Sequence, residues 1–225
     1  MNYFMKRVLV LIISLFLVST LFGQYKGGHN SASKDKEKSF IKEFGIGVGY
    51  PFPVSSKTTA NIGLAAELKM TYPISDYINF SFGVELNQLK QEKDTIIFTL
   101  NTACKDAKMS SWYLTIPLAF SFYPIESHNW SVFAGAYTGV RLSAKTEGIF
   151  YDPSDYTAPM YDMSKDAPMK KVDFGVDLGF SYHLVLMKKY KLNIKPKYRF
   201  GLIKLLENKS DIYNQGFQLM LSVEL

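Results

Sequence analysis

Apolar residues recur at every second position along most of this chain, from Phe40 to its end. The stretch 112–122 (WYLTIPLAFSF) shows the pattern most clearly, with Trp112, Leu114 and Ile116 on one face. Successive side chains of a strand point to opposite faces, so a period of two predicts strands. No window of useful length shows a helical period, and the pattern therefore predicts an all-β fold.

Eight such stretches occur, and each has an uncharged, mostly apolar face. That face takes the even positions of 44–50, 62–72, 78–86, 112–122, 130–142, 172–184 and 192–202 and the odd positions of 217–225. The opposite face holds every glycine from Gly45 to Gly216 except Gly148. It also carries the acids Glu67, Glu85, Asp173, Asp177 and Glu224 and the bases Lys69, Arg141, Lys195, Lys197 and Arg199.

Two kinds of barrel could be built from these strands, and they differ in which face lies inside. A soluble barrel of the lipocalin type buries the apolar face, but eight strands enclose only enough space for their own side chains or one small ligand. The inverted barrel places the apolar residues against lipid and the glycines inside, where they leave room for long charged side chains. Lipid also forces the sheet to close, because an open edge leaves backbone groups unpaired. We therefore predict an eight-stranded antiparallel up-and-down transmembrane β-barrel over residues 40–225.

Strand lengths and connections agree with a membrane barrel. The stretch 112–122 matches the ~9–11 residues of a tilted membrane strand. Short turns are expected at 73–76, 124–129 and 187–191, long loops at 51–60, 87–110 and 143–170, and an intermediate connection at 205–213. Outer-membrane barrels have short periplasmic turns and long external loops, so both termini are expected in the periplasm.

Aromatic residues and prolines add two expectations about the strands. Aromatic girdles at the two membrane interfaces are expected from Tyr50, Tyr72, Trp112, Trp130 and Tyr182. Pro117 and Pro196 fall inside strands and cannot donate to the ladder, so a bulge or local bend is expected at each.

The first 39 residues have a different composition. Lys6 and Arg7 precede the uncharged, mostly apolar run 8–22, and Gly23 is a small residue suited to cleavage. This predicts a secretory signal peptide over residues 1–23, because the run is shorter than the ~20 apolar residues of a spanning helix. Residues 24–39 are polar and rich in Gly, Ser and Lys, and we expect a flexible periplasmic tail.

Three segments resemble the small outer-membrane β-barrel family that includes PorT-like proteins. Residues 113–118 (YLTIPL) resemble the family's aromatic-Leu-x-Ile-Pro-Leu strand, and residues 132–137 and 172–176 resemble its next two strands. The resemblance covers about residues 40–225 and implies an OmpA-like eight-stranded barrel without the peptidoglycan-binding domain. Residues 214–221 are similar to the signal that the barrel assembly machinery recognises. A subset of the family assists protein secretion.

The inward charges are the strongest candidate for a functional site. Asp173 and Asp177 can face Lys195, Lys197 and Arg199 across one ladder. Buried charges are costly unless they are paired, so equal numbers of acids and bases favour a self-neutralised plug over an ion path.

Other candidate sites are weaker. Asp177, Ser181 and His183 share one face, but residues two apart on a strand lie ~6.6–6.8 Å apart, too far for triad contacts of ~2.6–3.2 Å. The loop 147–166 is rich in Asp and Tyr without the spacing of a calcium loop. Cys104 is the single cysteine, and no nearby base indicates a catalytic thiol. We expect no cofactor and no metal.

The resulting hypothesis is a non-enzymatic outer-membrane barrel with a plugged polar lumen that presents surface loops in a structural or interaction role. Its expected partners are outer-membrane lipid, the barrel assembly machinery during biogenesis and unidentified envelope or secretion proteins, but no nucleic acid. A narrow pore or an accessory of a secretion apparatus is the alternative. A lipid-modifying barrel enzyme is the third possibility.

Overall fold

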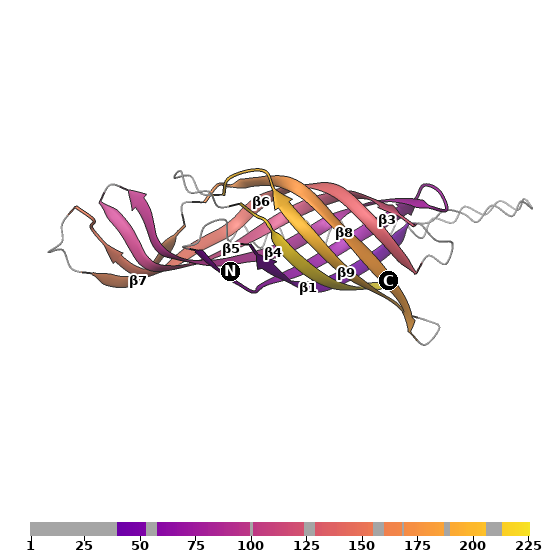
Figure 1. The fold of residues 1–225 in the computed structure, drawn as a ribbon, viewed down its shortest axis with the longest axis horizontal. Coiled ribbons are helices and arrows are strands. Elements are labelled where there is room, and N and C mark those ends of the chain that lie inside the picture. The colour runs from indigo at the N-terminus through magenta and orange to yellow at the C-terminus, as the bar shows by residue number, and fades with distance from the viewer. Residues whose placement is uncertain are drawn as a thin grey trace, which may run out of the picture. The chain divides into compact units, whose positions relative to one another are not determined.

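The strands close into a ring in which every strand runs antiparallel to both neighbours (Figure 1). The computed structural model describes residues 40–52, 58–99, 101–123, 129–154, 160–167, 169–186, 190–205 and 213–225. The ring strands are β1 (Ile41–Pro51), β3 (Gly63–Pro73), β4 (Ile78–Thr99), β5 (Thr102–Phe122), β6 (Trp130–Tyr151), β8 (Val172–Leu186), β9 (Tyr190–Gly201) and β10 (Gly216–Glu224). The predicted signal peptide and tail, residues 1–39, lie outside the described residues.

The ring order is β4-β3-β1-β10-β9-β8-β6-β5, and β5 pairs back with β4. The first and last strands form the seam, where Phe44 lies opposite Val223 and Tyr50 opposite Phe217. Two short strands, β2 (Thr58–Asn61) and β7 (Tyr161–Asp166), pair with β4 and β6. The predicted eight-stranded antiparallel barrel is confirmed.

The alternation of the sequence sets the two faces of the ring. Large apolar side chains such as Ile46, Phe120 and Phe174 are exposed on the outside. The glycine-rich face is inside, where a side chain at Gly45 would lie 2.9 Å from Cγ of Glu67. Among the described residues, no helix is long and apolar enough to cross a membrane.

The two ends of the ring differ. At one end, here called the turn end, β3 passes to β4 through Ile74–Tyr77, and β10 ends at Glu224. At the other, the hairpin end, β4, β5 and β6 continue far beyond the ring, and β7 pairs with the extension of β6 (Figure 1). The connections 87–110 and 143–170 are therefore largely strands, and the loop prediction for them was wrong.

These extensions form a small curved sheet with its own apolar cluster. Ile96, Cys104 and Phe150 pack together there, and Phe98 and Phe150 have ring centroids 5.3 Å apart. Bulges at Lys105/Lys108 and Trp112/Tyr113 mark the extension of β5. The cluster explains why the strands persist outside the ring, because burying one apolar face stabilises a sheet that water covers on the other.

The two prolines interrupt the ladder without shifting it. The pairing of β4 with β5 passes from Phe82↔Leu118 to Glu85↔Thr115 in the same register around Pro117. The pairing of β8 with β9 likewise skips Pro196 and keeps its register. Because the register is unchanged, these pairings contain no bulge at either proline, although two successive pairs are missing from the ladder at each site. The local bend expected there stays a prediction.

Candidate functional site

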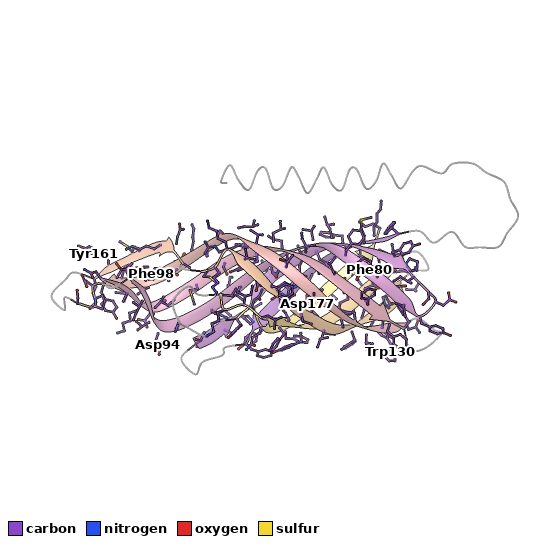
Figure 2. All side chains as sticks on the ribbon, turned by 90° about the horizontal axis from the view of Figure 1, so that it is seen from above. Phe80, Asp94, Phe98, Trp130, Tyr161 and Asp177 are labelled. Atoms are coloured by element: carbon purple, nitrogen blue, oxygen red, sulfur yellow. The ribbon has the colours of Figure 1, made fainter. Side chains whose placement is uncertain are left out.

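Inward side chains from five strands meet inside the ring as two ionic clusters. The turn-side cluster consists of Glu43, Glu67, Lys69 and Lys195. The hairpin-side cluster consists of Glu85, Asp177, Lys197 and Arg199. Each contains two carboxylates and two cations, so each is neutral when all its members are ionised. Figure 2 shows Asp177 within the ring, between the ends marked by Trp130 and Tyr161.

In the turn-side cluster, Lys195 of β9 joins β1 and β3. Its Nζ donates to Glu43 Oε2 at 3.0 Å and also to Glu67 Oε1. Lys69 Nζ lies 3.3 Å from Glu43 Oε1, and the Ser222 hydroxyl donates to Glu43 Oε2 at 3.0 Å. The Glu43 carboxylate therefore accepts from three side chains, which compensates for its burial.

In the hairpin-side cluster, Arg199 binds Asp177 through two parallel hydrogen bonds. Its Nε lies 2.8 Å from Oδ1 and its Nη2 lies 2.7 Å from Oδ2. Arg199 Nη1 is 3.2 Å from Oε1 of Glu85, a residue of β4, and Lys197 donates to the same carboxylate. The guanidinium also lies over the Tyr137 ring at 4.1 Å. Arg199 and Glu85 are 1% and 0% exposed, so the charges of this cluster are shielded from solvent.

The pairs connect strands that are not neighbours in the ring. Lys197 on β9 reaches Glu85 on β4, and Lys195 on β9 reaches Glu67 on β3. Of the expected contacts between β8 and β9, the described residues form those of Asp177 with Lys197 and Arg199. Paired charges spanning the lumen tie opposite walls together, whereas a single ladder would join only adjacent strands.

Three predicted members of the network lie elsewhere. Arg141 donates to the carbonyl oxygens of Ala167 and Met169 and makes no ion pair in the described part of the chain. Asp173 Oδ2 accepts from Asn214 Nδ2 at 2.6 Å. Glu224 pairs with Lys191 at 2.9 Å at the turn end, where both are partly exposed.

Glu43 is the functional residue that sequence reasoning missed. It shares the inward parity of Gly45, Gly47 and Gly49 and lies one step before the stretch in which the first strand was placed. Continuing the inward positions of this strand from Gly45 back to residue 43 would have identified it.

Ala167, Met169, Lys170 and Leu205 form a group at the hairpin end, here called the cap, that contacts the inward side chains of Tyr113 and Arg141. Met169 and Leu205 are buried in the apolar cluster of the extended sheet. The Lys170 amide donates to the Leu205 carbonyl at 2.6 Å, and the Tyr113 hydroxyl donates to the Lys170 carbonyl at 3.3 Å. Together with the carbonyl contacts of Arg141, these bonds tie the cap to β5, to β6 and to the segment after β9.

The free space inside the ring decreases from the turn end. A vestibule of about 380 Å³ opens there, lined by Asn79, Tyr123, His183 and other residues. A cavity of about 40 Å³ lies between Glu67, Glu85 and Asp177, and one of about 20 Å³ lies near Asn214. The vestibule thus ends at the ionic clusters, beyond which each described cavity has room for only a few water molecules.

The weaker candidate sites do not assemble. Asp177 is engaged by Arg199, so it does not orient His183, whose Nδ1 lies 2.6 Å from Asn193 Oδ1 instead. Ser181 Oγ and His183 Nε2 have no hydrogen-bond partner within the described residues. The described residues contain no group of three or more His, Cys, Asp and Glu residues that could hold a metal ion.

Cys104 is buried in the extended sheet. Burial raises the pKa of its thiol, and the carboxylates of Asp106 and Asp162 raise it further. A thiol of this kind is a poor nucleophile at neutral pH.

The predicted girdle residues lie on the outside of the ring. Trp130 and Tyr182 are directly paired near the turn end, and Tyr72 is exposed at the same end of β3. Tyr50 is exposed near the hairpin end of β1. Trp112 pairs with Gln88 and Ser143 where β5 leaves the ring, inside a longer strand and not at its end.

A closed ring that is apolar outside and ionic inside defines an integral outer-membrane β-barrel, and the comparisons agree. The family model described as outer membrane protein beta-barrel domain matches residues 20–207. The chain belongs to this family and is a multi-pass barrel of the outer membrane. No curated protein matches the chain.

Solved structures of small barrels are similar to the chain. Neisserial surface protein A is 12% identical with a TM-score of 0.44, covering 83% of this chain and 95% of that one. The attachment invasion locus protein Ail of Yersinia pestis is 15% identical with a TM-score of 0.40, covering 84% and 97%. The N-terminal β-barrel domain of Pseudomonas aeruginosa OprF is 7% identical with a TM-score of 0.35, covering 84% and 98%.

Proposed function

We propose that this outer-membrane barrel is non-enzymatic, that its lumen is closed, and that it presents the extended sheet of β4–β7 outside the cell in a structural or interaction role. The observation that carries the proposal is the pair of neutral ionic clusters that join opposite walls of the ring. A permeating ion would have to separate these pairs and displace the cap. Separating a buried ion pair costs several kcal/mol, because each charge is left without compensation in a site shielded from water.

The alternative of a narrow pore draws support from the vestibule of about 380 Å³ at the turn end. That vestibule would serve as the entrance of a pore only if both clusters and the cap opened. Single-channel conductance of the reconstituted barrel separates the two functions. An accessory role in secretion is compatible with a closed lumen, and proteins that co-purify with the native barrel would identify it.

The enzyme alternative requires a nucleophile bonded to an activated base. Ser181 and His183 do not provide that contact, and Arg199 occupies the carboxylate of Asp177. Comparing membrane lipids from wild-type and deletion strains tests this alternative. An altered lipid species in the deletion strain, restored by the wild-type gene, would contradict the non-enzymatic proposal.

The proposal includes an orientation with the turn end in the periplasm. Residues 1–23 would then be removed as a signal peptide, residues 24–39 would form a periplasmic tail, and the barrel assembly machinery would recognise β10. Short turns at one end and long strands at the other support this orientation.

Labelling of intact cells with a membrane-impermeant maleimide tests the orientation. The barrel is first given a Cys104→Ser substitution, and a cysteine is then placed at Thr99 or at Ser75. Thr99→Cys should be labelled and Ser75→Cys should not. The reverse result would place the extended sheet in the periplasm and overturn the presentation role.

A further inference from the structure

The outer face of the barrel has an apolar groove where β10, β1, β3 and β4 lie side by side. The groove has a volume of about 510 Å³, and its lining includes Ile46, Leu64, Ala66, Leu86 and Trp112. Ala66 explains the depression, because its register partners are the bulkier Ile46 and Leu86. The groove lies in the band that faces lipid, so an acyl chain is the natural occupant.

A row of basic residues lies immediately beyond this groove. Trp112 lines the groove, and two residues further along β5 the outward position is Ser110. Ser110 is paired with Lys90 on β4 and with Lys145 on β6. Neighbouring strands are about 4.8 Å apart, so the two lysines flank the serine on one face about 10 Å from each other. A step of two residues along a strand is about 6.7 Å, which puts this row just past the aromatic ring of Trp112.

The polar groups of this row are available to an anion. No ion pair to Lys90 or Lys145 occurs among the described residues, in contrast with the lysines of the two ionic clusters. The Ser110 hydroxyl accepts from Gln88 Nε2 at 3.1 Å, which leaves its own hydrogen to donate. Glu92 and Glu147 lie one row farther out, and Asp166 is paired with Lys145 in the register without forming an ion pair. Two ammonium groups beside a hydroxyl donor suit a phosphate.

We propose that this outer face binds one phosphate-bearing lipid, with an acyl chain in the groove over Ala66 and the phosphate between Lys90 and Lys145. Two features point to this ligand: the apolar groove suits an acyl chain, and the pair of lysines suits a phosphate. Trp112 joins the two, because it lines the groove and lies next to the row of Lys90 and Lys145. Basic clusters at the membrane surface bind anionic head groups by the same electrostatics. The site is on the outside of the barrel and does not depend on whether the lumen conducts.

The test is native mass spectrometry of the full barrel released from nanodiscs that contain phosphatidic acid and phosphatidylcholine with identical acyl chains. The wild type should retain one phosphatidic acid in preference to phosphatidylcholine. The double variant Lys90→Gln/Lys145→Gln should bind phosphatidic acid about 30-fold more weakly, the ratio that corresponds to about 2 kcal/mol for two lysines. Lys105→Gln, a substitution on the same sheet but farther from the groove, should bind like the wild type.

The groove is tested separately. Ala66→Phe fills it and should lower retention of phosphatidic acid, whereas Ala136→Phe on the outward face of β6 should not. Equal retention of both lipids by the wild type, or unchanged binding by both the lysine and the Ala66 variants, would overturn the proposal. If inorganic phosphate displaces the lipid and Ala66→Phe has no effect, the lysines bind a free anion and not a lipid. That result would also overturn the proposal.

Discussion

Replacing Asp177 by Asn should destabilise the barrel far more than the same change at an exposed aspartate. Asp177 is 4% exposed and accepts two hydrogen bonds from Arg199. Its neutralisation leaves Glu85 as the only carboxylate of the hairpin-side cluster against two cations. Removing one partner of a buried ion pair costs about 3–5 kcal/mol, because the remaining charge stays buried without compensation. The midpoint of urea unfolding in lipid vesicles, followed by gel migration without heating, measures the loss.

Two further variants show whether charge balance is the cause. Asp94→Asn, at an exposed position on the extended sheet, should change stability by no more than about 0.5 kcal/mol. Adding Lys197→Gln to Asp177→Asn restores neutrality and leaves the Glu85–Arg199 contact, whose atoms are 3.2 Å apart. The double variant should therefore recover part of the loss. Equal stability of Asp177→Asn and Asp94→Asn, or a further loss when Lys197→Gln is added, would show that charge balance does not stabilise the hairpin-side cluster.

Three other predictions concern the outer face and the extended sheet. Phe174→Arg should cost about 2–4 kcal/mol by placing a charge in lipid, whereas Ile97→Arg on the extended sheet should cost little, and equal tolerance at both would show that the faces are misassigned. Gly148 has a φ of 150° and its Cβ would lie 2.7 Å from a facing carbonyl oxygen, so Gly148→Ala should speed amide hydrogen exchange in the extended sheet without affecting the ring. Because the pKa of the Cys104 thiol is raised, its thiolate forms only at higher pH, and its maleimide labelling should be slower at neutral pH than that of Thr99→Cys in a Cys104→Ser background and should rise at higher pH. Equal rates for the two thiols would show that Cys104 is accessible.

The pattern of the sequence was sufficient for the ring because lipid and lumen impose opposite demands on alternate residues. Every set assigned to the apolar face lies outside, and Phe174 and its inward neighbour Gly175 illustrate the alternation. The extensions of β4–β6 could not be predicted in this way. Their outer face carries charged residues such as Lys108 and Glu147, and their buried face holds a short apolar cluster that includes Cys104 and Phe150. No long alternating apolar run therefore marks these extensions in the sequence.

The ion pairs could be predicted as a class but not individually. Which inward residues meet depends on the stagger of the strands around the ring. Lys197 and Glu85 are 112 positions apart in sequence, and no local pattern relates their heights in the lumen. Asp173 shows the same limit, since its partner Asn214 is a neutral residue outside the predicted strands.

Single-channel recording of the reconstituted wild-type barrel tests the closed lumen most directly. An open porin recorded in the same bilayers establishes that a pore would be detected. The two ionic clusters and the cap of Ala167, Met169, Lys170 and Leu205 should leave the wild-type barrel with no steady current above that of the bare bilayer. A large and stable single-channel current through the wild type would contradict the closed lumen and favour the pore.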